Sequence, residues 1–436
     1  MNGSGPDPVR RWIYPLSVKG RFQRYHRVAG VILQAFLFGL PWLRVDGRPA
    51  VLFDLPGRRA WLFGQVFTPE DTIFLVLLGL LAAFSLFFFT ALWGRLWCGY
   101  ACPQTVFLEE WVRPLERWIE GERGVRMARD RGPWTWDKVW RKAVKWNAFA
   151  LLAIGVSLTF VSWFVDARDV WTGNTSSAAY GVAGVLAVAM FIDFAWFREQ
   201  FCNFLCPYAR FQGALMDPGS QMVAYDVQVG EPRRGVDAGS GACIDCNKCV
   251  AVCPQGIDIR DGFQLECITC ARCIDACTGV MGKLGHASLI RYRPLEPQPL
   301  LRPRTVAYAS LLGALATATV TLLVGRGDLD ASIVRMPGTL YTVDPDGWVR
   351  NTYLLRVSND TARGTDATVA VNGLPNGAEL LVPTVHVGGA EDQTVPVVLR
   401  IPAASATART LPFTLTITAG ESHVEVPATF KSGGAP

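Results

Sequence analysis

Cysteine is the residue type in this sequence whose number and spacing could do chemistry. The chain of 436 residues contains 12 Cys, and all of them lie between Cys98 and Cys277. Clustered cysteines in a chain of this length are more often metal ligands or redox groups than parts of a disulfide scaffold. The cysteines therefore predict metal or redox chemistry in the middle of the chain.

Eight of the cysteines form two runs with one spacing, C-x2-C-x2-C-x3-C, followed by Pro254 in the first run and Thr278 in the second. This is the bacterial ferredoxin spacing for two [4Fe–4S] clusters, in which the fourth Cys of each run ligates the other cluster. The predicted ligands are Cys243, Cys246, Cys249 and Cys277 for one cluster and Cys253, Cys267, Cys270 and Cys273 for the other.

Two zinc knuckles are the alternative for these eight residues. Zinc sites usually pair two C-x2-C units across a longer gap, whereas four Cys follow one another in each run of this chain. The tandem runs therefore favour iron–sulfur clusters. Thr278 changes the turn after Cys277 but removes no ligand.

The remaining four cysteines form a duplicated C-x3-C-P motif, with copies that begin at Cys98 and Cys202. Because Pro is favoured as the first residue of a helix, the second Cys of each copy, Cys102 or Cys206, is expected at a helix N-cap. The helix dipole there favours negative charge and should lower the thiol pKa. Four such thiols would form a soft site suited to Cu(I), zinc or an iron–sulfur cluster.

Buried structural thiols, two disulfides and a third cluster are the alternatives for these four residues. Cytosolic disulfides are rare, and two matched copies at the ends of apolar stretches favour one shared site. Iron content separates a third cluster from the other interpretations, because about eight Fe per chain fits two clusters and about twelve fits three.

Five apolar stretches are predicted to cross a membrane, which needs about 20 residues of helix. They are 28–43, 72–97, 147–165, 181–197 and 306–325. The composition agrees, since 50% of the residues are hydrophobic and 18% are charged, against about 25% charge in an ordinary soluble chain. The two C-x3-C-P copies follow the second and fourth stretches, which indicates a duplicated two-span unit.

Two polar features of these stretches bear on function. Asp193 lies within the fourth stretch, and a carboxylate inside a membrane is a functional candidate by default. The structural alternatives are that it pairs with Arg198 or reaches the membrane interface. No predicted span contains a His, which argues against bis-His haem in the membrane.

The positions of Lys and Arg predict the orientation, because cytoplasmic loops carry an excess of both. The basic segments are the one before the first span, the loop 98–146 and the segment 198–305. The N-terminus and the cysteines are therefore expected in the cytoplasm, and five spans would place the tail in the periplasm. An even number of spans would break this agreement.

The tail is predicted to be all-β. Short apolar runs alternate with Gly, Pro, Asn and Asp, at 352–357, 368–371, 379–387, 395–401, 413–417 and 424–430. About seven short strands in roughly 100 residues are typical of an immunoglobulin-like sandwich.

The predicted fold class is thus an α-helical membrane protein of five spans with a cytoplasmic two-cluster ferredoxin-like domain and a C-terminal all-β Ig-like sandwich. Its parts are an N-terminal segment, a four-span membrane domain with both C-x3-C-P motifs, the ferredoxin-like domain, the fifth transmembrane helix and the periplasmic sandwich, at 1–27, 28–209, 210–305, 306–325 and 326–436. A net charge of +5 from 42 basic and 37 acidic residues gives little support to nucleic-acid binding.

This combination and order of parts resembles the CcoG/FixG/RdxA family, bacterial inner-membrane accessory proteins for the assembly of cbb3-type cytochrome c oxidase. The resemblance covers almost the whole chain, with Thr278 as a departure. It implies that a cytoplasmic electron donor feeds the two [4Fe–4S] clusters, that Cu(II) is reduced to Cu(I), and that copper is substrate or transient ligand. The copper site would be formed by Cys98, Cys102, Cys202 and Cys206.

The resemblance also implies partners, which are copper-handling proteins and oxidase assembly proteins beside the lipid bilayer. Related polyferredoxins share both Cys patterns, so a quinol-linked electron-transfer subunit of the NapH/NosR type is an alternative function. A non-enzymatic oxidase assembly scaffold is another. The sequence leaves open whether the two C-x3-C-P motifs meet within one chain or across a homodimer.

Overall fold

The structure is a computed structural model that describes residues 12–433, except 46, 69–70, 235–240, 295, 297, 300–301, 326, 328, 339, 360, 362–363, 390, 407 and 421. The chain divides into two compact units, Met1–Trp42 with Leu75–Thr317 and Leu43–Phe74 with Ala318–Pro436. All twelve cysteines belong to the first unit.

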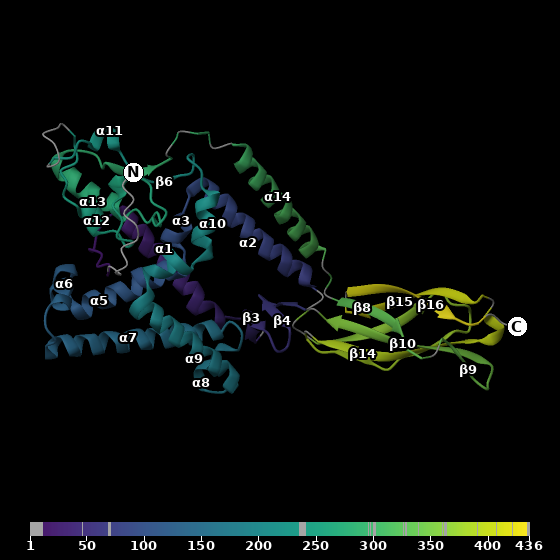
Figure 1. Ribbon diagram of the computed structural model, residues 1–436. Helices are drawn as coiled ribbons and strands as arrows, with labels where there is room; N and C mark the ends of the chain where they lie inside the picture. The colour runs from purple at the N-terminus through teal and green to yellow at the C-terminus, as the bar shows by residue number, and fades with distance from the viewer. Residues whose placement is uncertain are drawn as a thin grey trace. The chain divides into compact units, whose positions relative to one another are not determined.

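Within the described residues, four helices are long and apolar enough to cross a membrane. They are α2 (Thr72–Trp93), α7 (Trp136–Val161), α9 with its π-helical end (Ser177–Phe197) and α14 (Pro303–Val324). Each matches one of the predicted stretches. α2 and α14, drawn in Figure 1, are apolar all round. They bury few side chains, which is the pattern of helices that face lipid.

The first predicted span, 28–43, is a helix of a different composition. α1 (Arg21–Gly39) begins earlier than predicted, so Arg21, Arg24 and Arg27 lie in its first two turns. It is not among the four membrane-length apolar helices found in the described part of the chain. The orientation predicted from the basic loops needs an odd number of spans, and it therefore needs α1 to cross as well.

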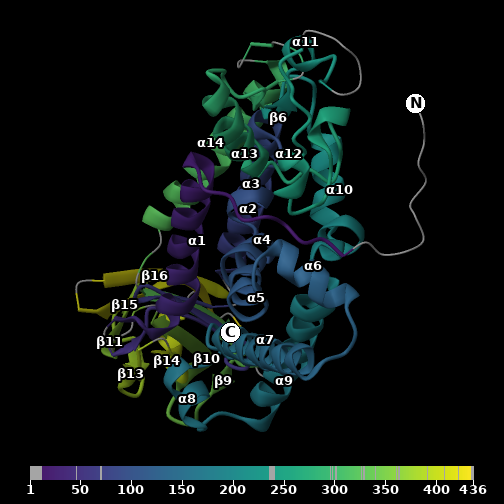
Figure 2. The ribbon, with the colours of Figure 1, turned by 90° about the vertical axis from the view of Figure 1, so that its left-hand side faces the viewer.

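Short helices connect α2 to α7. Their bounds are α3 (Leu96–Tyr100), α4 (Pro103–Phe107), the π-helical η3 (Leu108–Val112), α5 (Arg113–Glu120) and α6 (Arg123–Arg131). α8 (Ala167–Thr172) then links α7 to α9 (Ser177–Ile192), and α7 and α9 pack along each other (Figure 2). Phe107, Phe149 and Phe194 are in the buried core that joins these helices.

The ferredoxin-like part follows the π-helical segments η4 (Asp193–Phe197) and η5 (Phe201–Leu205). Its elements are α10 (Pro207–Leu215), β6 (Met222–Tyr225), α11 (Val227–Gly230), α12 (Lys248–Ala251), η6 (Ile259–Asp261), α13 (Arg272–Met281), η7 (Gly282–Leu284) and β7 (Ile290–Arg293). β6 pairs antiparallel with β7, which closes the segment on itself. Its core includes Val223, Ile259, Ile274 and Ile290.

A side chain of α13 holds this part against α1. The Asp275 carboxylate accepts hydrogen bonds from the backbone N–H groups of Phe22 at 3.2 Å and Gln23 at 2.8 Å. These are donors of the first helical turn, which have no partner within the helix. The start of α1 is therefore fixed by the ferredoxin-like part.

The second unit begins with small sheets to which the sequence analysis assigned no strands. After η1 (Leu40–Trp42) come β1 (Arg44–Val45), β2 (Arg48–Pro49), β3 (Val51–Asp54), β4 (Arg59–Leu62) and β5 (Gln65–Phe67). The last three form an antiparallel sheet, and Gly64 with φ +90° makes the turn between β4 and β5. Strands of two to four residues are too short to show a recognisable alternation of apolar and polar residues.

The tail is the predicted two-sheet sandwich (Figure 1). One sheet has the order β12-β14-β10-β8 with β9 beside β10, and the other has the order β13-β11-β15-β16. Alternate residues of both sheets, such as Leu355, Leu399 and Ile417, are fully buried between them. The strands are β8 (Leu329–Arg335), β9 (Thr342–Val343), β10 (Trp348–Asn359), β11 (Thr365–Asn372), β12 (Glu379–Leu381), β13 (Val385–Val387), β14 (Asp392–Pro402), β15 (Thr410–Ala419) and β16 (Ser422–Lys431).

One apolar run of the tail does not form the single strand that the pattern suggests. The run 379–387 splits into β12, which pairs with β14, and β13, which pairs with β11 in the opposite sheet. Pro383 lies in the break, and Pro cannot donate to a strand ladder. The chain therefore changes sheets at that point.

Candidate functional site

The four cysteines predicted to hold the first cluster lie around one cavity. Cys243, Cys246, Cys249 and Cys277 line about 410 Å³ of empty space, together with side chains such as Tyr225. Cys246 is exposed, whereas the other three are partly buried. Of the cysteines that line the two cavities, Cys246 is the one that is exposed.

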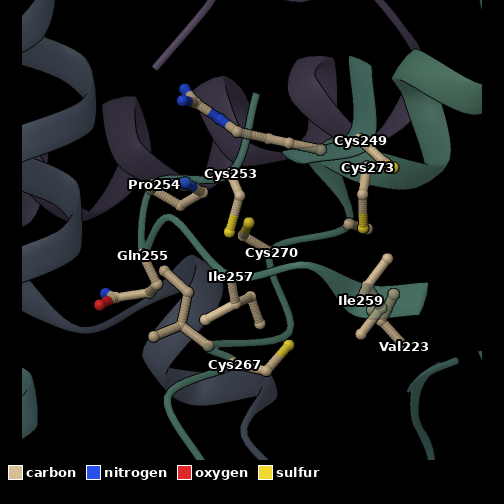
Figure 3. Close-up of a pocket in the computed structure, with 13 residues that line it drawn as sticks. Val223, Cys249, Cys253, Pro254, Gln255, Ile257, Ile259, Cys267, Cys270 and Cys273 are labelled. Atoms are coloured by element: carbon tan, nitrogen blue, oxygen red, sulfur yellow. The ribbon is translucent and has the colours of Figure 1, made fainter. Parts of the chain in front are cut away.

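The four cysteines predicted for the second cluster surround a neighbouring cavity of about 370 Å³. Cys249 lines both cavities. In the view of Figure 3 the sulfur atoms of Cys253 and Cys270 lie close together, with Cys273 to the right and Cys267 below. Ile257, Ile259 and Val223 complete an apolar wall.

The two C-x2-C-x2-C loops share an uncommon backbone. The residues on both sides of Cys246 have positive φ (Asp245 and Asn247), and so do those on both sides of Cys270 (Thr269 and Ala271). Asp and Asn tolerate this conformation, but it is a genuine outlier for Thr, which is β-branched. Such strain persists where the surrounding structure needs it. The repeated pattern curls each loop around its cavity.

Burial keeps these thiols neutral in the absence of iron. It raises the pKa of Cys249 and Cys267 to about 11 and that of Cys270 to about 12. Thiols ligate metals as thiolates, so a bound metal must supply the positive charge. In the described part of the chain no three His, Cys, Asp or Glu side chains are grouped to hold one metal ion. Sulfurs spread around two cavities fit a cluster better than a single zinc ion, which needs four ligands at about 2.0–2.3 Å.

The C-x3-C-P cysteines take the local positions that the sequence predicts. Cys98 lies in α3, and Cys202 lies in η5. Cys102 and Cys206 are the N-caps of α4 and α10, each followed by Pro in the first turn. The duplicated motif therefore makes two helix starts.

The two copies of the motif meet within one chain. The Cys98 thiol donates a hydrogen bond of 3.0 Å to the side-chain oxygen of Gln212, which is fully buried on α10 after the second copy. Cys98 also interacts electrostatically with Cys102, Cys202 and Cys206. The four thiols are neighbours, although they are not grouped closely enough to hold an ion as they stand.

The predicted lowering of the thiol pKa by the helix dipole is wrong for Cys102. Burial raises the pKa of Cys202 to about 12 and raises that of Cys98 further. For Cys102 burial outweighs the backbone N–H groups of Gln104 and Thr105, which lower the pKa. These thiols therefore need a bound cation to become thiolates.

One C-x3-C-P thiol, Cys98, packs against residues that line the second cavity. Cys98, Ile268 and Cys270 belong to one buried cluster, with Tyr208 packed on it. The backbones also touch, because a β-carbon on Gly99 would stand 2.6 Å from the Ile268 carbonyl oxygen. The structure thus joins the two cysteine sets that the sequence treats separately.

A network of buried charges, which the sequence analysis missed, holds the ferredoxin-like part to the helices. Arg272 lies 2.5 Å from Glu109, and Arg113 pairs with the same carboxylate. Arg113 also donates a 3.0 Å hydrogen bond to the Pro254 carbonyl. The i,i+4 spacing of Glu109 and Arg113 was the available signal.

Other expected partners also differ. Asp193 accepts hydrogen bonds of 2.9 and 2.8 Å from Gln104. Arg198 pairs with Glu116 at 2.5 Å. His26, which borders the membrane in the sequence, is 1% exposed and lies 3.5 Å from Glu110. These partners come from distant segments, so local sequence does not reveal them.

Comparisons with known proteins match three segments of the chain. Residues 197–294 match the model of a 4Fe-4S dicluster domain, and residues 75–124 match that of a 4Fe-4S binding domain. Residues 319–433 match a family described as the Ig-like fold at the C-terminus of FixG. The first match covers both ferredoxin runs and the second C-x3-C-P copy, and the second match covers the first copy.

Full-length relatives agree with these matches. The chain is 33% identical over 420 residues to the nitrogen fixation protein FixG of Rhizobium meliloti, covering 84% of this chain and 80% of that protein. It is 38% identical over 387 residues to protein RdxA of Cereibacter sphaeroides, with coverages of 83% and 82%. The ferredoxin-type protein NapH of Haemophilus influenzae is 23% identical over 209 residues, covering 45% of this chain and 64% of that protein.

Four membrane-length helices in the described residues, iron–sulfur domains and these relatives characterise a bacterial membrane iron–sulfur electron-transfer protein. The chain belongs to the FixG/RdxA family.

Proposed function

We propose that this protein reduces Cu(II) to Cu(I) at the four C-x3-C-P thiols, as part of the assembly of cbb3-type cytochrome c oxidase. The observation that carries the proposal is the buried contact among Cys98, Ile268 and Cys270. It joins thiols with soft-metal chemistry to a cavity that fits an iron–sulfur cluster.

The ligand assignment follows the two cavities. One [4Fe–4S] cluster would be held by Cys243, Cys246, Cys249 and Cys277, and the other by Cys253, Cys267, Cys270 and Cys273. When bound, such clusters supply one-electron reduction. The stoichiometry agrees, since each Cu(II) takes one electron to become Cu(I).

The residues that line the cavities indicate the direction of electron transfer through the site. Cys246 is exposed, so the first cavity is the one a soluble electron donor can approach. The second cavity shares Cys249 with the first and is adjacent to Cys98 through Cys270. Electrons would thus pass from the donor to the first cluster, then to the second cluster, and last to copper bound by Cys98, Cys102, Cys202 and Cys206.

Soft sulfur favours the product of this reaction. Thiolates bind Cu(I) in preference to harder cations, so a four-thiol site stabilises reduced copper. Each buried thiol must lose a proton when it binds the metal. The raised pKa values of Cys98 and Cys202 therefore predict weak binding of hard divalent ions that bond poorly to sulfur.

The proposed topology has five spans, with α1 as the first. It puts the N-terminus, both cavities and the C-x3-C-P thiols in the cytoplasm and the sandwich in the periplasm. Its support is the excess of Lys and Arg in the segments 1–27, 98–146 and 198–305, the first of which includes the start of α1. The periplasmic sandwich would then be free to bind an oxidase assembly partner.

The test replaces Cys98, Cys102, Cys202 and Cys206 together with Ala. Purified protein is reduced anaerobically, mixed with Cu(II) and assayed with a chelator specific for Cu(I). The variant should keep its ferredoxin-type iron and lose both copper binding and Cu(I) formation. Copper reduction at the wild-type rate in the variant would refute the assigned site.

A third cluster at these four thiols is the second candidate, because residues 75–124, which contain Cys98 and Cys102, match a 4Fe-4S binding domain. Iron analysis separates the two functions. About twelve Fe per wild-type chain, falling to about eight in the four-Ala variant, would favour the third cluster, whereas about eight in both favours copper.

A further inference from the structure

An open pocket of about 450 Å³ lies beside Cys202, apart from the two ferredoxin cavities. Its walls come from η5, α10 and the loop before Cys267, and one wall carries Cys202. Small-molecule sites have volumes of about 300–1,000 Å³. The pocket is thus large enough for a ligand much bigger than a metal ion.

Two arginines and one glutamate line this pocket, so its net charge is positive. They are Arg95, Arg210 and Glu266. Arg95 is 5% exposed, and its guanidinium donates hydrogen bonds to the carbonyl oxygens of Leu265 and Ala209 on two walls of the pocket. This holds a buried cation at a fixed place, while Arg210 is exposed and has its donors available to a ligand.

The carboxylates nearest Cys202 belong to other residues and do not line the pocket. Asp193 and Glu199 act electrostatically on Cys202, but neither is among the lining side chains. Asp193 is bonded to Gln104, and Glu199 lies 3.8 Å from Arg113. The lining of the pocket therefore carries a net positive charge, whereas Asp193 and Glu199 act on Cys202 from outside the lining.

We propose that this pocket receives copper as an anionic complex of a small carboxylate ligand. The inference rests on the proposed function in taking copper as the cargo. Arg210 binds the carboxylates of the carrier, and Arg95 adds a fixed positive charge. Cys202 then exchanges with the carrier: a Cu–S bond forms, a Cu–O bond breaks, and the thiol proton leaves with the released carboxylate.

The first test measures the charge preference of the pocket without copper. Cys202 is alkylated in anaerobic holoprotein with iodoacetate, which is anionic, or iodoacetamide, which is neutral, and the modified peptide is quantified. Because both reagents attack the same Cys202 thiolate, the ratio of their rates does not depend on the fraction of Cys202 that is ionised. One charge acting through solvent over several ångströms changes such a ratio by about two- to threefold, so Arg210→Gln should lower the iodoacetate preference by that factor.

The matched control is Arg291→Gln, an arginine outside the pocket that pairs with Asp226. It should leave the ratio unchanged, and Arg210→Lys should restore most of the preference. An equal ratio in wild type and Arg210→Gln would overturn the inference. Failure of both reagents to modify Cys202 in the wild type would overturn it as well, because the pocket would then not open onto the thiol.

The second test uses two copper complexes, anionic Cu(II) citrate and neutral Cu(II) bis-glycinate. Arg210→Gln should raise the KM for the citrate complex about two- to threefold, with kcat unchanged and with no change for bis-glycinate. A matching rise in both KM values would overturn the inference but leave copper reduction standing. Charge-selective alkylation without reduction of either complex would overturn copper as the cargo, and the proposed function with it.

Discussion

Gly99 lies so close to Cys270 that a β-carbon on Gly99 would stand 3.1 Å from the α-carbon of Cys270. The same β-carbon would be 2.6 Å from the carbonyl oxygen of Ile268, a distance that real β-carbons essentially never show. The residue that follows the first C-x3-C-P cysteine therefore has to be Gly. Its missing side chain lets the two cysteine sets approach each other.

Gly99→Ala should separate these two sets. The added methyl group meets backbone, which cannot rotate away, and overpacking of this kind costs about 1–3 kcal/mol of stability. We expect the variant to keep its ferredoxin-type iron and its copper affinity but to form Cu(I) more slowly in a single turnover. Rapid mixing of reduced protein with Cu(II) measures that rate.

Gly155→Ala is the control, since a β-carbon on Gly155 in α7 meets nothing within 4 Å. It should reduce copper at the wild-type rate. Equal rates in Gly99→Ala and Gly155→Ala would show that the contact has no part in electron transfer.

The crossed ligand sets predict which substitutions share a spectroscopic effect. Cys253→Ala and Cys270→Ala should weaken the same EPR signal of the reduced protein, although Cys253 belongs to the first run. Cys277→Ala and Cys246→Ala should weaken the other. In each variant the iron content should fall by about four atoms if the damaged cluster is lost. If Cys253→Ala weakened the same EPR signal as Cys246→Ala, the ligand assignment would be contradicted.

The Glu109–Arg272 pair predicts a large effect on stability. Both side chains are buried, so Glu109→Gln leaves Arg272 without this carboxylate and leaves Arg113 only its 3.8 Å pair with Glu199. Breaking a buried pair costs about 3–5 kcal/mol. Thermal unfolding of the two proteins in one detergent measures the difference.

Glu379→Gln makes the same chemical change in an exposed pair, 2.6 Å from Arg400 with a side chain 46% exposed. Exposed pairs contribute about 0–1 kcal/mol. A loss from Glu109→Gln no greater than that from Glu379→Gln would contradict a docking role for the buried pair.

Glu116 predicts a pH dependence of stability. Burial alone would raise its pKa, but Arg198, Lys145 and Arg126 outweigh burial and lower the pKa from 4.5 to about 2. The folded carboxylate therefore stays charged when the unfolded one protonates. Its contribution to stability is present above about pH 4.5 and is lost as the pH falls toward 2.

Comparison of wild type with Glu116→Gln isolates this contribution. The difference in unfolding midpoint should be largest at pH 6–7 and should shrink between about pH 4.5 and 3, where wild-type Glu116 begins to lose its charge advantage. Acid damage to bound clusters affects both proteins and cancels in the difference. A difference that stays constant over this range would refute the lowered pKa.

Cysteine spacing and the hydrophobic pattern were enough to predict most of the fold. The two runs placed Cys253 and Cys277 at opposite cavities, and the Pro after each C-x3-C motif marked the starts of α4 and α10. Both follow from local rules, since ligand spacing and helix starts depend on neighbouring residues.

The predictions that were wrong concern properties that depend on burial and on contacts between distant parts of the sequence. The raised pKa of Cys102 comes from burial, which no local pattern shows. Arg198 pairs with Glu116 because helix packing brings α5 to it. The helical run 28–43 extends back to Arg21, where Asp275 of the ferredoxin-like part caps the helix. The closeness of Gly99 and Cys270 likewise depends on tertiary structure alone.

Electron transfer from the clusters to copper is tested most directly by following iron and copper in one sample. Anaerobically reduced protein is mixed with one equivalent of Cu(II) and frozen at intervals for EPR, which detects reduced clusters and Cu(II) separately. In the wild type the Cu(II) signal should disappear while the signal of the reduced clusters falls by one electron for each copper reduced, and both signals should persist when Cys98, Cys102, Cys202 and Cys206 are replaced by Ala. Equal loss of both signals in that variant would contradict electron transfer to copper at these thiols.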